Sequence, residues 1–114
     1  MREFNIWTQE DYEAAAVAAI DCIIHIWDDA VITIHGSEHD NRFCEINAHD
    51  NAVVKAYGFI SVDAYDNSHV ELHDNTYGYA YDNATVEVFN TACVDACSDN
   101  VTIVRHSDEC QIIN

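Results

Sequence analysis

An eight-residue repeat dominates this sequence and limits what the chain can fold into. From Asp50 to Cys97 six octads follow one another without insertion: DNAVVKAY, GFISVDAY, DNSHVELH, DNTYGYAY, DNATVEVF and NTACVDAC. The same frame fits IDCIIHIW and DDAVITIH over 20–35 and RFCEINAH over 42–49, with GSEHDN (36–41) as an insertion between them. After Cys97 the frame slips and the pattern decays. So regular a repeat predicts a stack of equivalent units.

Each position of the octad has its own character. The third, fifth and seventh positions are apolar or small, as in Ala52, Val54 and Ala56, and this alternation is typical of a strand with one buried face. The first two positions are most often Asp-Asn, a pair that forms turns. We therefore predict an all-β solenoid, a parallel, right-handed β-helix of eight-residue repeats. The small inward residues favour two octads per coil, because a wider coil would contain voids, although the residue columns also fit three.

The N-terminal segment is predicted to cover the first coil. Thr8 and Asp11 form a T-x-x-D capping pattern ahead of YEAAAVAAI, which predicts a helix over about 9–20. The alternative is one more octad over 12–19. We expect a single domain over 1–114, in which residues 1–20 form the N-terminal cap and residues 20–114 form the repeat solenoid.

The C-terminal coil is expected to remain open. The sequence ends in CQIIN, in which Ile112 and Ile113 are apolar and no capping segment follows the repeats, and an open coil exposes unpaired strand edges. From this we predict a homodimer formed by end-to-end stacking through the C-terminal coil.

The chain is strongly acidic. Its 21 Asp and Glu residues stand against 4 Lys and Arg, for a net charge of −17. That balance argues against direct binding to nucleic acid or to an anionic membrane, both of which need clustered basic residues. A hydrophobic content of 49% is too high for an acidic disordered tail. On a rod of roughly 22–26 Å the charge density would approach that of duplex DNA, and such a field would steer the chain onto a basic nucleic-acid-binding groove.

The N-terminus and the cysteines bear on location and metals. Met1 to Trp7 shows no charged segment followed by an apolar run, so we expect no signal peptide and a cytoplasmic location in a bacterial host. The odd count of 5 cysteines indicates reduced thiols. We expect no metal and no cofactor. Zinc is disfavoured because closely spaced ligand pairs are missing around Cys93, Cys97, His106 and Cys110, and calcium because the turns lack Gly.

The eighth position of the octad carries large rings. We expect them to form a ladder beside the turns, stacked from coil to coil, in preference to a platform for a ligand. The set is Trp27, His35, His49, Tyr57, Tyr65, His73, Tyr81 and Phe89. No nucleophile has a partner base at an informative spacing, so we do not expect an enzyme.

The repeat also carries a resemblance to known proteins. In AYDNS at 64–68, AYDNA at 80–84 and AYGFI at 56–60, it resembles the short octad-repeat proteins of prophages and other mobile elements. In architecture it is similar to pentapeptide-repeat proteins that mimic DNA, although the period differs. The resemblance implies an anti-restriction or anti-CRISPR inhibitor, and above all one that blocks target DNA binding by a CRISPR effector nuclease.

Outward-facing acids are the residues that such an inhibitor would present to its partner. Acids at the sixth position point outward by alternation, whereas those at the first position are also explained by turn formation. The candidates are Asp63, Asp66, Glu71, Asp74, Asp82, Glu87 and Asp95. A second set, Glu38, His39 and Asp40, lies in the insertion, because interruptions of a repeat often lie on a binding face.

Two other functions fit the same repeat. A structural or self-assembling module, such as a virion or tail component, would form end-to-end filaments. A calcium-binding repeat protein would gain thermal stability from the ion and lose it with a chelator.

Overall fold

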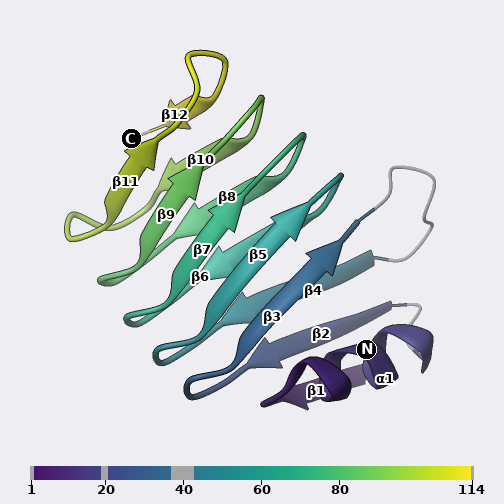
Figure 1. The fold of residues 1–114 in the computed structure, drawn as a ribbon. Helices are drawn as coiled ribbons and strands as arrows, with labels where there is room; N and C mark the ends of the chain where they lie inside the picture. Colours follow the sequence, from purple (N-terminus) through teal and green to yellow (C-terminus); the bar gives the residue numbers. More distant parts are fainter. Residues whose placement is uncertain (1, 19–20, 37–42, 114) are drawn as a thin grey trace.

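The computed structural model describes residues 2–18, 21–36 and 43–113, and it is a β-solenoid with one short helix (Figure 1). The elements follow in the order β1 (Arg2–Ile6), α1 (Gln9–Ala18), β2 (Asp21–Ile26), β3 (Val31–His35), β4 (Phe43–Ala48), β5 (Val53–Tyr57), β6 (Ser61–Ala64), β7 (His69–Leu72), β8 (Tyr77–Ala80), β9 (Thr85–Val88), β10 (Cys93–Ala96), β11 (Thr102–Arg105) and β12 (Gln111–Ile113). The predicted all-β solenoid of parallel strands is confirmed.

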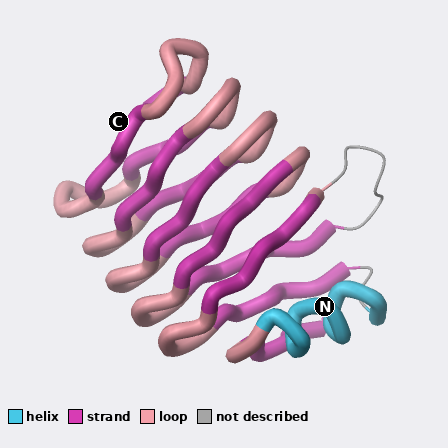
Figure 2. The backbone as a smooth tube through the Cα atoms, viewed as in Figure 1, coloured by secondary structure: helices cyan, strands magenta, loops and turns pink. Residues whose placement is uncertain are grey.

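Consecutive strands alternate between two parallel sheets, which form the two flat faces of the molecule. One sheet has seven strands in the order β1-β2-β4-β6-β8-β10-β12, and the other has five in the order β11-β9-β7-β5-β3. Figure 2 shows the turns that join them, gathered along two opposite edges. From β2 onward, two strands that follow each other in the sequence therefore lie on opposite faces. Neighbouring repeats thus present their outward residues in opposite directions.

The pairing register gives the length of a coil. Val54 pairs with Val70 and Val70 with Val86, so equivalent residues are sixteen positions apart. Sixteen residues is the two-octad length that the sequence favours. Between β2 and β4 the offset is larger, with Ile24 opposite Ile46, because the insertion lies between β3 and β4.

The core is a thin layer between the sheets, filled by columns of apolar side chains. Strands β5, β7 and β9 bury every second residue, as the period-two pattern predicts. Leu72 and Gly78 show how the two sheets fit together. A Cβ atom added to Gly78 would lie 2.6 Å from Leu72 Cδ1, so Gly78 interrupts the valine column because Leu72 occupies the space.

The N-terminal end is closed by a helix and by an unpredicted strand. The helix expected over 9–20 is present as α1, while residues 19 and 20 lie outside the described residues. Asp11 N–H donates to Thr8 Oγ1 at 3.1 Å, as in a capping box. Gln9 covers the free edge of β3, since its side chain donates to the Thr33 carbonyl at 3.0 Å and accepts the Thr33 N–H at 2.7 Å. Strand β1 pairs in parallel with β2.

The C-terminal end has no such cover among the described residues, where β11 and β12 are the outermost strands of the two sheets. Arg105 of β11 is in register with Val88, which is fully buried. Strand β11 therefore places a charged, exposed residue at a position that faces the core in the preceding coil. Inward-facing charge is one way in which natural sheets discourage pairing at an edge.

Candidate functional site

Both edges of the solenoid carry stacks of rings, as the eighth position predicts. One stack contains Trp27, His49, Tyr65 and Tyr81, with successive ring centroids 4.1, 5.4 and 4.8 Å apart. The other contains His35, Tyr57, His73, Phe89 and His106, with centroids 5.1, 4.4, 4.2 and 4.2 Å apart. The predicted ladder of stacked rings is confirmed, and it divides between the edges because alternate repeats end at opposite edges.

The turn aspartates use their carboxylates to join one coil to the next. Asp66, Asp74 and Asp82 each have a φ near 57°, in the left-handed region, which Asp tolerates better than most residues. Asp66 Oδ2 accepts the Asp50 N–H at 2.9 Å, and Asp82 Oδ2 accepts the Asp66 N–H at 3.0 Å. These three predicted site residues are therefore turn-forming residues as well as exposed charges.

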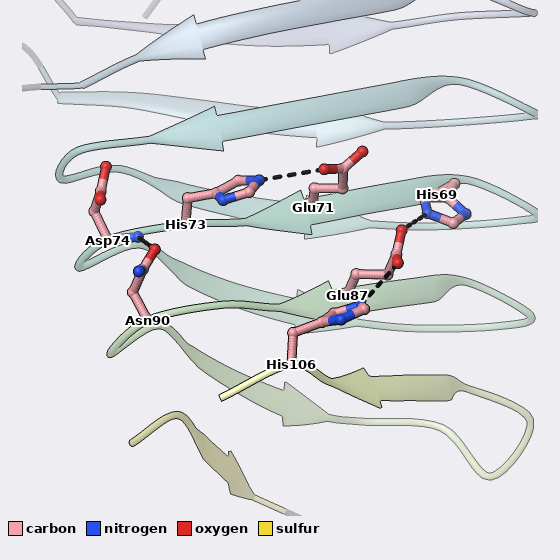
Figure 3. Close-up of polar contacts among 7 residues, drawn as sticks. All are labelled: His69, Glu71, His73, Asp74, Glu87, Asn90 and His106. Carbon is pink, nitrogen blue, oxygen red and sulfur yellow. Dashed lines mark hydrogen bonds and ion pairs between the residues drawn. The ribbon is translucent and has the colours of Figure 1, made fainter. Parts of the chain in front are cut away.

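Asn90 shows that the turn hydrogen bond does not require a charge. At the edge of the His35 stack, Asp74 Oδ2 accepts the Gly58 N–H at 2.9 Å. One coil further on, Asn90 Oδ1 accepts the Asp74 N–H at 3.0 Å (Figure 3). An amide oxygen and a carboxylate oxygen thus perform the same structural task, so the charge of the aspartates is additional to it.

The outward acids of the five-stranded sheet are hydrogen-bonded to histidines (Figure 3). Glu71 and Glu87 lie opposite each other on β7 and β9. Glu87 accepts hydrogen bonds from His69 at 2.6 Å and from His106 at 2.9 Å, and His73 lies 3.2 Å from Glu71. The hydrogen bond from His69 is the largest cause that lowers the pKa of Glu87, and the hydrogen bond from His106 is the second.

The outward acids of the seven-stranded sheet stand in a different environment. Asp63 of β6 and Asp95 of β10 are both in register with Tyr79 of β8, which separates them. Burial, and next the carboxylate of Glu45, raise the pKa of Asp63. Within the described part of the chain no ion pair involves Asp63, Asp95 or Glu45.

The N-terminal part of the seven-stranded face has its own histidine network. His25 lies 3.0 Å from Glu3 and shares a 2.9 Å hydrogen bond with His49. Burial, and next the neighbouring His25, lower the pKa of His49. Among the side chains that the structure describes, the acids of this face without an ion pair lie in its middle, around Tyr79.

The predicted site residues that the structure describes thus lie on four surfaces, the two flat faces and the two edges. Asp63 and Asp95 lie on one flat face and Glu71 and Glu87 on the other. The turn aspartates divide between the edges, and Glu38, His39 and Asp40 lie outside the described residues. Sequence reasoning missed the histidine partners and the outward Tyr77 and Tyr79. His69, Tyr77 and Tyr79 stand at the fourth or sixth octad position, whereas His73 stands at the eighth and His106 follows the frame slip. Their contacts become visible only once the coils are stacked.

The described residues contain no group of three or more His, Cys, Asp or Glu side chains that could hold a metal ion. Cys110 is buried and its thiol donates to the Ser107 carbonyl at 2.9 Å. Cys97 is exposed as a whole residue. Partial desolvation of its thiol is nevertheless the largest of the effects that raise its pKa. A high thiol pKa disfavours the reactive thiolate.

Among the described residues, α1 is far too short and polar to cross a lipid bilayer as a helix. Comparison with known proteins finds no matching family model, no matching curated protein and no matching solved structure.

Proposed function

We propose that this chain is an acidic DNA mimic that binds the nucleic-acid-binding groove of a defence nuclease. Its target is the DNA-binding groove of a CRISPR effector, and a restriction-type nuclease is the related alternative. In this proposal the chain acts in the cytoplasm of a bacterial host, has no enzymatic activity and needs no cofactor. It does not touch nucleic acid itself.

The observation that carries this proposal is the charge per unit length. Six spacings of about 4.8 Å separate the first and last strands of the seven-stranded sheet, so the sheet extends over about 29 Å. Strand β1 makes this longer than the sequence-based estimate. B-DNA of that length carries about 17 phosphate charges, and the net charge of the chain is −17.

The distribution of the acids supports the same proposal. They occur on both flat faces and along both edges, as phosphates surround a duplex, and the chain contains 4 Lys and Arg to offset them. Self-repulsion at this density destabilises a compact fold. A purely structural role would be better served by opposite charges on adjacent strands.

The resemblance to octad-repeat proteins of mobile elements belongs to this proposal, as does the finer description of the fold as a right-handed helix of eight-residue repeats. The sixteen-residue register supports the eight-residue repeat, and a right-handed connection is the usual one between parallel strands.

The direct test is competition with DNA on a purified CRISPR effector. We expect the chain to inhibit DNA binding, and the inhibition constant to rise at least tenfold between about 50 and 300 mM salt, because phosphate-like contacts are screened. A basic protein with no DNA-binding groove, such as lysozyme, serves as the specificity control.

A triple charge reversal makes the test specific to this chain. Glu71→Lys, Glu87→Lys and Asp95→Lys together should abolish inhibition, while circular dichroism verifies that the solenoid remains folded. The matched control replaces Glu10 and Glu13 of α1 and Glu109 of the last turn with Lys, which changes the net charge equally. If the first variant inhibits as well as the wild type does, DNA mimicry is wrong.

The homodimer expected through the C-terminal coil stays a prediction. The open strands β11 and β12 favour it, whereas the inward position of Arg105 opposes it. Light scattering decides between the two: a single species of 12.9 kDa at high protein concentration would exclude the homodimer and, with it, the rival self-assembling module.

A further inference from the structure

The outward acids of the two flat faces differ in their availability to a partner. On the five-stranded face both Glu71 and Glu87 already have histidine partners. On the seven-stranded face Asp63 and Asp95 have no cationic partner within the described residues. Asp95 Oδ1 accepts only a weak hydrogen bond from the Cys97 thiol at 3.8 Å, so the second pair lacks a cation of the chain itself and can bind one from outside.

A row of outward side chains crosses the middle of the seven-stranded face. Asn47, Asp63, Tyr79 and Asp95 follow one another on β4, β6, β8 and β10, each in register with the next. Tyr79 is 37% exposed, and the centroid of its ring lies 5.0 Å from that of Tyr77, at an angle of 46° between the ring planes. We call this row, with Glu45 beside it, the Tyr79 face.

Asn47 adds an observation that is independent of the acids. It points outward, because its neighbours Ile46 and Ala48 face the core, yet it is 7% exposed. No hydrogen bond to its side-chain amide occurs among the described residues. The buried side-chain atoms that lack a hydrogen-bond partner in the described part of the chain are Ser68 Oγ and Thr76 Oγ1, so the amide of Asn47 keeps some contact with solvent. It can therefore donate to, or accept from, a ligand bound on the neighbouring Asp63.

An arginine side chain has the chemistry that this row requires. Its planar guanidinium stacks on an aromatic ring and presents five donors in its own plane. Two strand spacings place the outward positions of Asp63 and Asp95 about 10 Å apart, with the Tyr79 ring between them. A guanidinium lying on that ring could therefore donate to a carboxylate on either side. Lysine would offer one point charge and no stacking plane.

We propose that the Tyr79 face binds an arginine side chain of the partner protein, with the guanidinium stacked on Tyr79 and hydrogen-bonded to Asp63 and Asp95. This inference rests on the proposed function, because arginines line the grooves that bind nucleic acid. It goes further in naming the face of the solenoid and the residue type that meet.

The experiment uses a hexa-arginine peptide and a hexa-lysine peptide as probes of the full chain. Asp63→Asn with Asp95→Asn removes two charges from the Tyr79 face, and Glu71→Gln with Glu87→Gln removes two from the opposite face. At about 150 mM salt, we expect the first pair to weaken hexa-arginine binding at least tenfold and the second at most about twofold. Isothermal titration calorimetry measures both, and circular dichroism verifies the fold.

The aromatic contribution is tested by Tyr79→Val, which keeps a good strand former. We expect it to weaken hexa-arginine binding about fivefold and hexa-lysine binding by less than twofold. Should that variant unfold, amide chemical shifts of the wild type keep the test valid, since hexa-arginine should move the resonances of β6, β8 and β10 and leave β7 and β9 in place.

Equal loss of affinity from both charge pairs would overturn the inference, because a uniform field would then account for binding. Equal binding of hexa-arginine and hexa-lysine to the wild type would overturn the assignment to arginine. The proposed function fails separately: if no effector is inhibited while the Tyr79 face still prefers hexa-arginine, the DNA mimic is wrong and the arginine site remains. If the variant with both Asp63→Asn and Asp95→Asn still inhibits an effector fully, the arginine site is wrong and the DNA-mimic proposal remains.

Discussion

The two flat faces of the solenoid share one backbone geometry and differ in the state of their acids. On the five-stranded face Glu87 accepts two histidine hydrogen bonds, and its pKa is lowered. On the seven-stranded face Asp63 is partly buried beside Glu45, and its pKa is raised. The same formal charge therefore stabilises the fold on one face and opposes it on the other, so net charge by itself does not indicate which acids are available to a partner.

The largest effect is expected where the two faces are joined. Leu72→Ala empties the space behind β8 and should lower the free energy of unfolding by about 3 kcal/mol. Gly78→Ala by itself should cost roughly 2 kcal/mol, because the new Cβ meets Leu72. The double variant should lose less free energy of unfolding than the two single variants lose together. Urea unfolding of the four proteins measures this, and strict additivity would contradict the packing described here.

Glu87 tests the face whose acids are paired. Glu87→Gln should lower stability at pH 7 by about 1 kcal/mol, since two charge-assisted hydrogen bonds on a partly exposed side chain are weakened. Because the pKa of Glu87 is lowered in the folded state, its contribution is present above the ordinary Glu pKa and is lost as the pH falls through the folded value. Urea unfolding between pH 7 and pH 3 should therefore show the two proteins converging in acid, with Glu13→Gln on α1 as the control.

Asp63 tests the other face and should give the opposite sign. Asp63→Asn should raise stability at pH 7 by roughly 0.5 kcal/mol, because a charge that burial and Glu45 disfavour is removed. With the pKa raised in the folded state, the penalty in the wild type disappears as the pH falls from above the folded pKa to below the ordinary Asp value. A loss of stability in Asp63→Asn at pH 7 would show that the two faces do not differ in this way.

The smallest effect is expected from a substitution that removes only the charge of a turn aspartate, at an edge that belongs to neither face. Asp74→Asn should change stability by less than about 0.3 kcal/mol, because the amide oxygen can accept the Gly58 N–H as Asn90 accepts the Asp74 N–H. Asp74→Ala removes the acceptor and should cost about 1 kcal/mol. Equal destabilisation by both would mean that the turn depends on the charge.

The octad pattern predicts the strands, the turns and the inward columns well because each depends on local alternation or on a turn preference. It does not reveal β1, because Arg2–Ile6 lies outside the octad repeat. This strand pairs with β2, from which the helix α1 separates it in the sequence. The inward position of Arg105 could not be predicted either, because the octad frame slips after Cys97. Only the strand pairing shows that Arg105 aligns with Val88 and therefore faces the core.

The site was predicted less completely than the fold. Alternation correctly places acids such as Glu87 outward, but it cannot show that successive repeats face opposite ways until the coil length is known. The histidine partners of Glu87 come from strands or turns eighteen and nineteen residues away. Such contacts are set by coil stacking, so no motif of short spacing could have revealed them.

The constant register makes the coil an exchangeable unit of length. Tyr65 and Tyr81 are each followed by Asp-Asn, so excision of residues 66–81 would rejoin the chain at an identical turn. Such a deletion shortens the rod by about 4.8 Å and removes Asp66, Glu71 and Asp74, three negative charges. Duplex DNA carries about 2.8 charges over the same distance. Evolution or design can thus lengthen or shorten this protein by whole coils, in steps that keep its charge per unit length close to that of duplex DNA.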